Sequence, residues 1–120
     1  MARILVVDDS IISRNSLKAI LAQGGHEVAG EAGNGEDALT LYEKIRPDIV
    51  TMDVTMPGLG GIESLRRIMA CDPQAKVIMI SASGQGYKVL EAMDRGARHY
   101  LTKPFQAALV LSAIGEVLRA

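Results

Sequence analysis

The segment Ile4-Leu5-Val6-Val7-Asp8-Asp9 ends a continuous apolar run on two adjacent carboxylates. A second segment of the same kind, Asp48-Ile49-Val50-Thr51-Met52-Asp53, ends on a further carboxylate. Short apolar runs without polar alternation are typical of strands buried on both faces of a parallel sheet. Doubly wound folds place their sites at the carboxyl-terminal edge of such sheets. If the two strands are neighbours, we expect Asp8, Asp9 and Asp53 to meet in one crevice.

Acids crowded in this way repel each other, so one carboxylate must take up a proton or a cation must bind. A site made only of oxygen ligands suits a hard divalent cation such as Mg²⁺. A capping role is also open, because acids near a helix start favour the helix dipole and Ser10 is a natural N-cap. Capping accounts for one acid but not for two acids that face a third. The pattern therefore favours a metal site.

Strand-like and helix-like segments alternate along the rest of the chain. The expected strands are residues 3–7, 27–32, 48–53, 76–81 and 98–101. The expected helices are residues 10–23, 35–45, 61–70, 87–95 and 105–119. Glycine or proline follows each of the first four helices, as helix-ending chemistry predicts. Alternation without a linker or repeat predicts an α/β fold, a single domain over residues 1–120 with one doubly wound parallel sheet.

Composition excludes several classes of protein. The chain has 120 residues, 48% hydrophobic and 22% charged, with a net charge of −1, which gives no electrostatic case for nucleic acid or an anionic membrane. Neither a signal peptide nor an apolar stretch long enough to cross a bilayer is present, so we expect a cytoplasmic protein. The lone Cys71 cannot form an internal disulfide and is interpreted as an incidental thiol at a helix end.

Several short motifs resemble the receiver domain of two-component response regulators. They are Asp8-Asp9, Asp53 followed by Met56-Pro57, Ser81-Ala82, and Tyr100 through Lys103-Pro104-Phe105. Residues 27–32, 47–53, 81–85 and 103–106 look most like stand-alone chemotaxis regulators of the CheY type. The resemblance covers the whole chain. It implies a flavodoxin-like (βα)5 fold with strand order 2-1-3-4-5, an order taken from known folds of this kind, CheY itself among them, and not worked out from the residues.

The resemblance also implies roles for individual residues. Asp53 would be the phosphorylated carboxylate, which fits because a carboxylate nucleophile is ionised at neutral pH. Mg²⁺ would contact Asp53 and Asp9 directly, Asp8 mostly through a water, and the backbone carbonyl of Thr55. Lys103 would supply the counter-charge, aimed inward by a cis peptide to Pro104.

Two further residues would form the switch. Ser81 matches the hydroxyl that binds the phosphoryl oxygen, and Tyr100 matches the aromatic ring that turns inward in response. An amphipathic ring on a half-buried strand is an equally simple interpretation of Tyr100. Thr55 and Ser83 match the positions that flank the phosphoryl group and tune its hydrolysis.

Two segments depart from the family pattern. The loop Met56-Pro57-Gly58-Leu59-Gly60-Gly61 has three glycines in four positions, so we expect greater mobility beside the metal site. The last helix is expected to bury Val110, Ile114, Val117 and Leu118 and to leave Leu109, Leu111 and Ala113 outward. Our hypothesis is that one surface meets a target or a second copy and is formed by Tyr87, Lys88, Tyr100, Leu109 and Leu111. We therefore expect the protein to be a monomer or a weak dimer through the last helix. The alternative is that this last helix is buried more deeply than we expect and that its apolar residues belong to the core.

The leading functional hypothesis is a signalling switch and not an enzyme. It would take a phosphoryl group from a CheA-like histidine kinase, bind a target such as the flagellar motor switch protein, and be reset by slow self-catalysis or a phosphatase. A phosphate sink or a regulator outside chemotaxis is the runner-up. A phosphatase-like enzyme would place a second acid two residues after the nucleophile, where this chain has Thr55. A flavodoxin-like cofactor binder is disfavoured because Asp8-Asp9 would repel a phosphate.

Overall fold

The computed structural model describes residues 1–82 and 85–119, and Ser83 of the expected pair of tuning residues lies outside that part of the chain. The five strands are β1 (Arg3–Val7), β2 (Glu27–Ala32), β3 (Ile49–Asp53), β4 (Val77–Ser81) and β5 (His99–Thr102). The five helices are α1 (Ile11–Gln23), α2 (Gly35–Ile45), α3 (Gly61–Cys71), α4 (Gly86–Asp94) and α5 (Ala107–Arg119). Every expected element is present, and its ends differ from the prediction by at most two residues.

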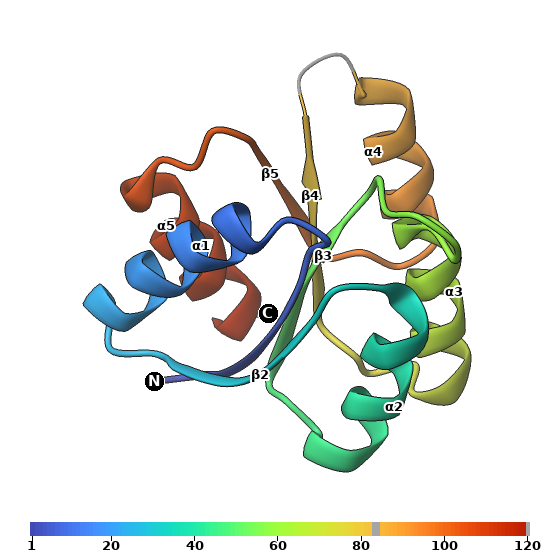
Figure 1. Ribbon diagram of the computed structural model, residues 1–120, viewed down its shortest axis with the longest axis horizontal. Coiled ribbons are helices and arrows are strands. Elements are labelled where there is room, and N and C mark those ends of the chain that lie inside the picture. Colours follow the sequence, from blue (N-terminus) through green and yellow to red (C-terminus); the bar gives the residue numbers. More distant parts are fainter. Residues whose placement is uncertain (83–84, 120) are drawn as a thin grey trace.

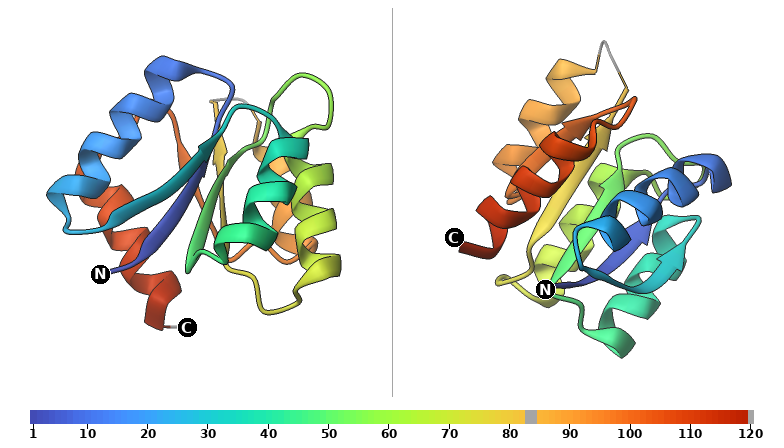
Figure 2. Two further views of the ribbon diagram at one scale, coloured as in Figure 1. Left: turned by 60° about the horizontal axis from the view of Figure 1, so that its bottom comes forward. Right: turned by 90° about the vertical axis from the view of Figure 1, so that its left-hand side faces the viewer.

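All strand pairs are parallel, and their order is β2-β1-β3-β4-β5. The doubly wound fold and the 2-1-3-4-5 order are confirmed. Helices α1 and α5 cover one face of the sheet, and α2, α3 and α4 cover the other (Figures 1 and 2). Because β1 and β3 are neighbours, the segments after them lie at the same edge of the sheet. None of the helices in the described residues has the length and apolarity that a bilayer-spanning segment needs.

Each face of the sheet has its own apolar core. One core lies under α2, α3 and α4 and includes Leu5, Val50, Met52, Leu65, Ile68 and Met79. The other lies under α1 and α5 and includes Ile4, Val6, Leu17, Ile49, Ile78 and Ile114. Residues of β1, β3 and β4 alternate between the two cores, which is why these strands are apolar on both faces. This rigid sheet fixes the position of the polar residues at its edge.

The last helix differs in part from the sequence prediction. Val110, Ile114 and Val117 are buried and Leu109 is 58% exposed, as expected. Ala113 is also buried, so its outward assignment is wrong; it lies on the same stripe as Val110 and Val117, three and four residues away. Leu111 is only partly exposed, because its side chain packs over Gly24 at the end of α1, where a Cβ on Gly24 would clash with it. Leu111 therefore does not share an exposed surface with Leu109.

Gly61 in the glycine-rich loop has a packing role that the sequence analysis did not predict. A Cβ at this position would collide with the backbone carbonyl of Asp53, and the Gly61 N–H donates to the Val54 carbonyl at 3.0 Å. The start of α3 is thus pressed against the end of β3, which only glycine permits. This contact fixes the backbone that carries Asp53.

Thr51 leads to a prediction about stability. It is fully buried on β3, and its Oγ1 has no hydrogen-bond partner among the residues that the structure describes. A buried unpaired hydroxyl destabilises the folded state, whereas Val has the same shape without it. We expect Thr51→Val to raise the free energy of unfolding by about 1 kcal/mol in urea titrations. A decrease would show that the hydroxyl has a partner in solution.

Candidate functional site

Three acids gather at the carboxyl-terminal edge of the sheet. Asp8 and Asp9 follow β1 and Asp53 ends β3, and one carboxylate oxygen from each lies within 4.8 Å of the others. Asp8 and Asp53 are buried, with 2% and 6% of their surface exposed, whereas Asp9 is exposed. The crevice expected from the two apolar runs is therefore present.

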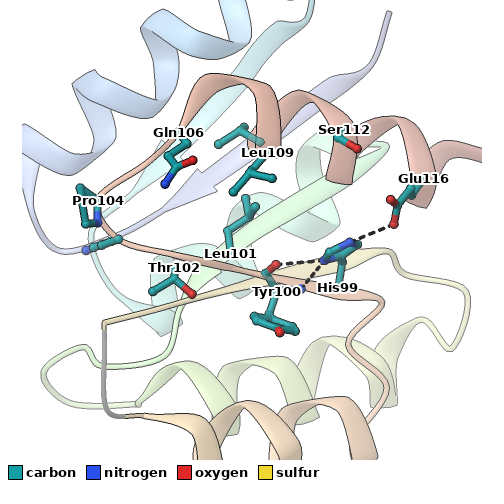
Figure 3. Close-up of a pocket in the computed structure, with 11 residues that line it drawn as sticks. His99, Tyr100, Leu101, Thr102, Pro104, Gln106, Leu109, Ser112 and Glu116 are labelled. Carbon is teal, nitrogen blue, oxygen red and sulfur yellow. Dashed lines mark hydrogen bonds and ion pairs between the residues drawn. The ribbon is translucent and has the colours of Figure 1, made fainter.

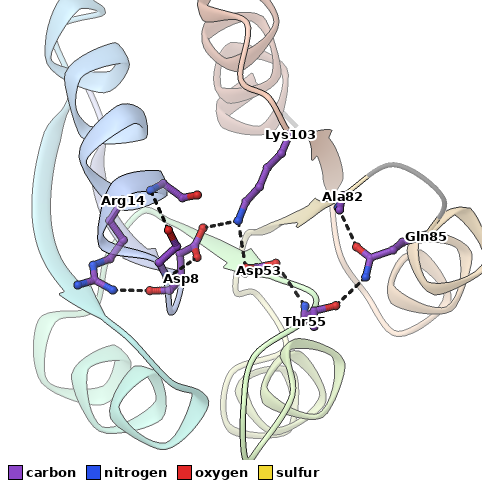
Figure 4. A network of polar contacts seen from close by, with 9 residues as sticks. Asp8, Arg14, Asp53, Thr55, Ala82, Gln85 and Lys103 are labelled. Carbon is purple, nitrogen blue, oxygen red and sulfur yellow. Dashed lines mark hydrogen bonds and ion pairs between the residues drawn. The ribbon is translucent and has the colours of Figure 1, made fainter.

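Lys103 is the cation that faces these acids. Its Nζ lies 2.9 Å from Asp8 Oδ2 and 3.2 Å from Asp53 Oδ2, and so it bridges both buried carboxylates (Figure 4). It follows β5, and the Lys103–Pro104 peptide bond is cis, as the resemblance implied. One ammonium group balances two buried carboxylates, which leaves the site with a deficit of positive charge.

Burial and the neighbouring charges shift two pKa values at the site. Burial and the nearby Asp8 carboxylate raise the pKa of Asp53 from 3.8 to about 6, against the opposing effects of Lys103 and the Thr55 N–H. Burial alone would lower the pKa of Lys103, but its contacts with Asp8 and Asp53 outweigh that effect and raise it. The lysine therefore keeps its charge, and the ionised Asp53 carboxylate gains from any further cation.

The loop after β1 both caps α1 and orients Asp8. The Ser10 N–H donates to Asp8 Oδ1 at 2.9 Å, and Ser10 Oγ caps the helix by accepting from the Ser13 N–H at 3.2 Å. Arg14 donates to the Asp8 carbonyl and forms an ion pair with Glu31 at 3.1 Å. Capping and site formation thus operate together at Ser10, whose hydroxyl caps α1 while its N–H orients Asp8.

The donor set fits Mg²⁺. All three acids offer oxygen atoms, which hard divalent cations prefer, and Lys103 alone balances the two buried carboxylates. The Thr55 N–H donates to Asp53 Oδ1 at 3.2 Å, which places residue 55 beside this carboxylate. Asp8, Asp9 and Asp53 are the residues that could hold the ion.

The expected switch residues lie around one hollow between β4, α4 and β5. Ser81, at the end of β4, is 3% exposed, and Tyr100, on β5, is 47% exposed. Both line this hollow together with Val89 and Leu90 of α4. The Tyr100 ring is therefore turned outward here, next to a space that opens toward Ser81.

Arg14 and Gln85 also contact the site, and neither was expected from the sequence. Gln85 Nε2 donates to Thr55 Oγ1 at 2.6 Å, and its Oε1 accepts from the Ala82 N–H at 2.7 Å (Figure 4). A polar residue one helical turn after the acid pair was the signal available for Arg14. No sequence signal pointed to the contacts of Gln85, because they join two loops that are distant along the chain.

Known proteins share both this sequence and this fold. A family model described as the response regulator receiver domain matches residues 4–115. The chemotaxis protein CheY of Thermotoga maritima is 48% identical over 115 residues, which are 96% of each chain. The CheY of Bacillus subtilis is 47% identical over 116 residues, 97% of each chain.

Solved structures agree with these sequence matches. The structure of a CheX–CheY–BeF3–Mg²⁺ complex from Borrelia burgdorferi matches with a TM-score of 0.92 and 38% identity over 96% of this chain and 87% of that one. NtrX from Brucella abortus matches with a TM-score of 0.92 and 32% identity over 98% of this chain, which spans only 27% of NtrX.

Proposed function

This chain belongs to the response regulator receiver domain family and is CheY-like, and on that premise we propose that it is a stand-alone chemotaxis switch phosphorylated on Asp53. The observation that carries the proposal is the bridge from Lys103 Nζ to the buried Asp8 and Asp53 carboxylates. A single lysine cannot neutralise both buried acids, so the site keeps excess negative charge that a bound cation would offset. This arrangement suits a site that gains and loses negative charge.

The proposed transfer follows from the position of Asp53. A carboxylate oxygen of Asp53 attacks the donor phosphorus, the bond from phosphorus to the donor's leaving atom breaks, and the leaving group departs with that electron pair. The product is an acyl phosphate, and attack by water on it returns the carboxylate and inorganic phosphate. Lys103 remains close to the added oxygens and offsets part of their charge. Mg²⁺, when bound, would supply the remaining positive charge to the phosphoryl oxygens.

The proposed switch joins the acceptor to the outer face of β5. Phosphoryl oxygens would draw the Ser81 hydroxyl toward Asp53, and the Tyr100 ring would then move into the hollow that both residues line. A hydrogen bond to a charged group contributes about 1.5–3 kcal/mol. Shifting a population from 1:99 to 99:1 takes about 5.5 kcal/mol. Lys103 and a bound partner must therefore add to the serine contact.

Phosphoryl uptake by purified protein tests this function. With acetyl phosphate and Mg²⁺, we expect each molecule to gain a single phosphoryl group in intact mass spectra, and none when EDTA replaces Mg²⁺. Release of inorganic phosphate should remain slow after the label saturates. Rapid steady turnover would instead indicate a phosphatase. Thr55, which is hydrogen-bonded to Gln85, offers no carboxylic acid to protonate a leaving group.

We propose that the partners are a CheA-like histidine kinase, a flagellar motor switch protein and a phosphatase, which would place the protein in the cytoplasm. The family match and the CheY relatives support these partner classes. A phosphate-sink role remains the second candidate. It differs in predicting phosphoryl transfer from the kinase without binding to the motor switch.

Exposed apolar side chains support a partner surface over α4, β5 and α5. Tyr87, Leu90, Met93, Tyr100 and Leu109 are exposed there, and Lys88 lies beside them. A hollow between β5 and α5 adjoins them, with Leu109 at its side and the Tyr100 ring directed away from α5 (Figure 3). Leu111, which faces Gly24, is omitted from this surface, and Leu90 and Met93 are added.

Leu109→Glu tests the partner surface. A carboxylate at this exposed position would have to be desolvated on docking, so we expect the affinity for a purified flagellar motor switch protein to fall about tenfold. Calorimetry with the phosphorylated protein measures this, and sedimentation velocity measures any self-association. Ile12→Glu is the matched control, because Ile12 is 83% exposed on α1, which does not contribute to this surface. Equal effects of the two variants would contradict the assignment.

A further inference from the structure

The side chain of Gln85 ties together the two loops on either side of the acceptor. Its Nε2 donates to Thr55 Oγ1 after β3, and its Oε1 accepts from the Ala82 N–H after β4, at 2.6 and 2.7 Å (Figure 4). The orientation of the amide follows from its partners, since a backbone N–H can only donate. Thr55 continues the chain, because its own N–H donates to Asp53 Oδ1 at 3.2 Å. A connected path thus runs from Asp53 to Ala82 through Gln85.

The backbone of Gln85 also begins α4. Its carbonyl accepts from the N–H groups of Lys88 and Val89 at 3.0 and 3.2 Å. Its side chain makes no capping bond to its own helix and bonds instead to both loops, with one bond from each end of the amide. One residue therefore links the acceptor loops to the helix that carries the exposed Tyr87 and Leu90.

The Ala82 N–H lies where an added phosphoryl group would seek donors. Asp53 is paired with Ile80 across the β3–β4 ladder, and Ala82 follows two residues later, just past the end of β4. A phosphoryl group brings three acceptor oxygens and nearly two negative charges. Hydrogen bonds to such oxygens are stronger than those to a neutral amide carbonyl.

We propose that Gln85 is a latch for the unphosphorylated state, whose amide occupies the Ala82 N–H and the Thr55 hydroxyl until the phosphoryl group on Asp53 displaces it. The inference rests on the proposed function of Asp53. On displacement, Gln85 Oε1 loses the Ala82 N–H to a phosphoryl oxygen, and the start of α4 is released from the loop after β4. The Thr55 hydroxyl, which accepts from Gln85 Nε2, can still donate its own proton to the phosphoryl group. The identity of residue 85 therefore sets how readily the domain accepts and keeps phosphate.

Gln85→Met tests the latch, because Met keeps the length of the side chain without its amide. Removal of a competitor from the resting state should raise the ratio of phosphorylation rate to dephosphorylation rate roughly threefold to tenfold, as expected for one or two neutral hydrogen bonds. The rates are measured by intact mass spectrometry with acetyl phosphate and Mg²⁺. Gln74→Met, in the turn before β4, is the matched control and should leave the ratio unchanged.

A spectroscopic measurement separates the latch from a general structural role. In ¹⁵N-labelled protein, the Ala82 amide resonance of unphosphorylated Gln85→Met should differ from that of the wild type, and both should converge on one position after phosphorylation. If the wild type takes up the phosphoryl group but Gln85→Met has the same ratio of phosphorylation rate to dephosphorylation rate, the latch is overturned and the proposed function stands. A wild type that takes up no phosphoryl group would overturn the latch and the proposed function together.

Discussion

Lys103→Met should lower the free energy of unfolding of the metal-free protein by about 2–3 kcal/mol at pH 8, the largest loss that we expect from a single substitution at the site. Among the described residues, Lys103 is the cation that contacts both buried carboxylates. Its Nζ lies 2.9 Å from Asp8 Oδ2 and 3.2 Å from Asp53 Oδ2. Without it, Asp8 and Asp53 repel each other in a buried setting. Removing one partner of a buried ion pair is costly because the other charge remains. Partial exposure of the lysine keeps the loss below that of a fully buried pair.

The dependence of this loss on pH distinguishes charge from packing. The pKa of Asp53 in the folded wild type is about 6, so near pH 5 this carboxyl is largely protonated and there is less charge to balance. We therefore expect the effect of Lys103→Met to shrink as pH falls from 8 to 5. Added Mg²⁺ should stabilise the variant more than the wild type. Urea titrations in EDTA measure the loss, with the exposed Lys44→Met as control. A loss independent of pH and metal would assign Lys103 a packing role.

Asp53→Asn should have the opposite effect and stabilise the metal-free protein at neutral pH. An acid whose pKa is raised on folding, here from 3.8 to about 6, holds its proton more tightly in the folded state. The ionised form therefore destabilises the fold, and this cost is absent below about pH 4, grows up to about pH 6 and is constant above. The rise in pKa sets an upper limit of about 3 kcal/mol. Asn removes the charge, so we expect a gain of about 1–2 kcal/mol at pH 8.

Unfolding curves at several pH values measure this gain. The variant and the wild type should differ most at pH 8 and become equal near pH 4, and Mg²⁺ should stabilise the wild type more than the variant. Glu43→Gln, at an exposed position of α2, should show no such trend. A variant less stable than the wild type at pH 8 would show that the pKa of Asp53 is not raised.

Local signals predicted the fold well because they agree with the packing. The strands over residues 3–7 and 27–32 and the helix over 35–45 begin and end as predicted. Their boundaries at glycine, proline and asparagine are decided by neighbours along the chain. Asn34, for example, caps α2 by accepting from the Asp37 N–H at 2.8 Å.

Local sequence signals could not predict contacts between segments that are distant along the chain. Leu111 is covered because Gly24 lies beneath it, and Gln85 matters because Thr55 and Ala82 lie on either side of it. Ala113 was misassigned because α5 is apolar around most of its surface, so periodicity alone did not separate its faces. The three acids were found from sequence because they follow or end a strand, where a parallel sheet brings such residues together, and Lys103 was implied by the resemblance.

The location of the phosphoryl group is the most direct test of the claim that this pocket makes Asp53 the acceptor. The protein would be incubated with acetyl phosphate and Mg²⁺, digested rapidly at low temperature, and its peptides mapped by tandem mass spectrometry. We predict that the label is on Asp53 alone and that Asp53→Asn remains unlabelled under the same conditions. Equal labelling of wild type and Asp53→Asn, or label on Asp8 or Asp9, would contradict the account.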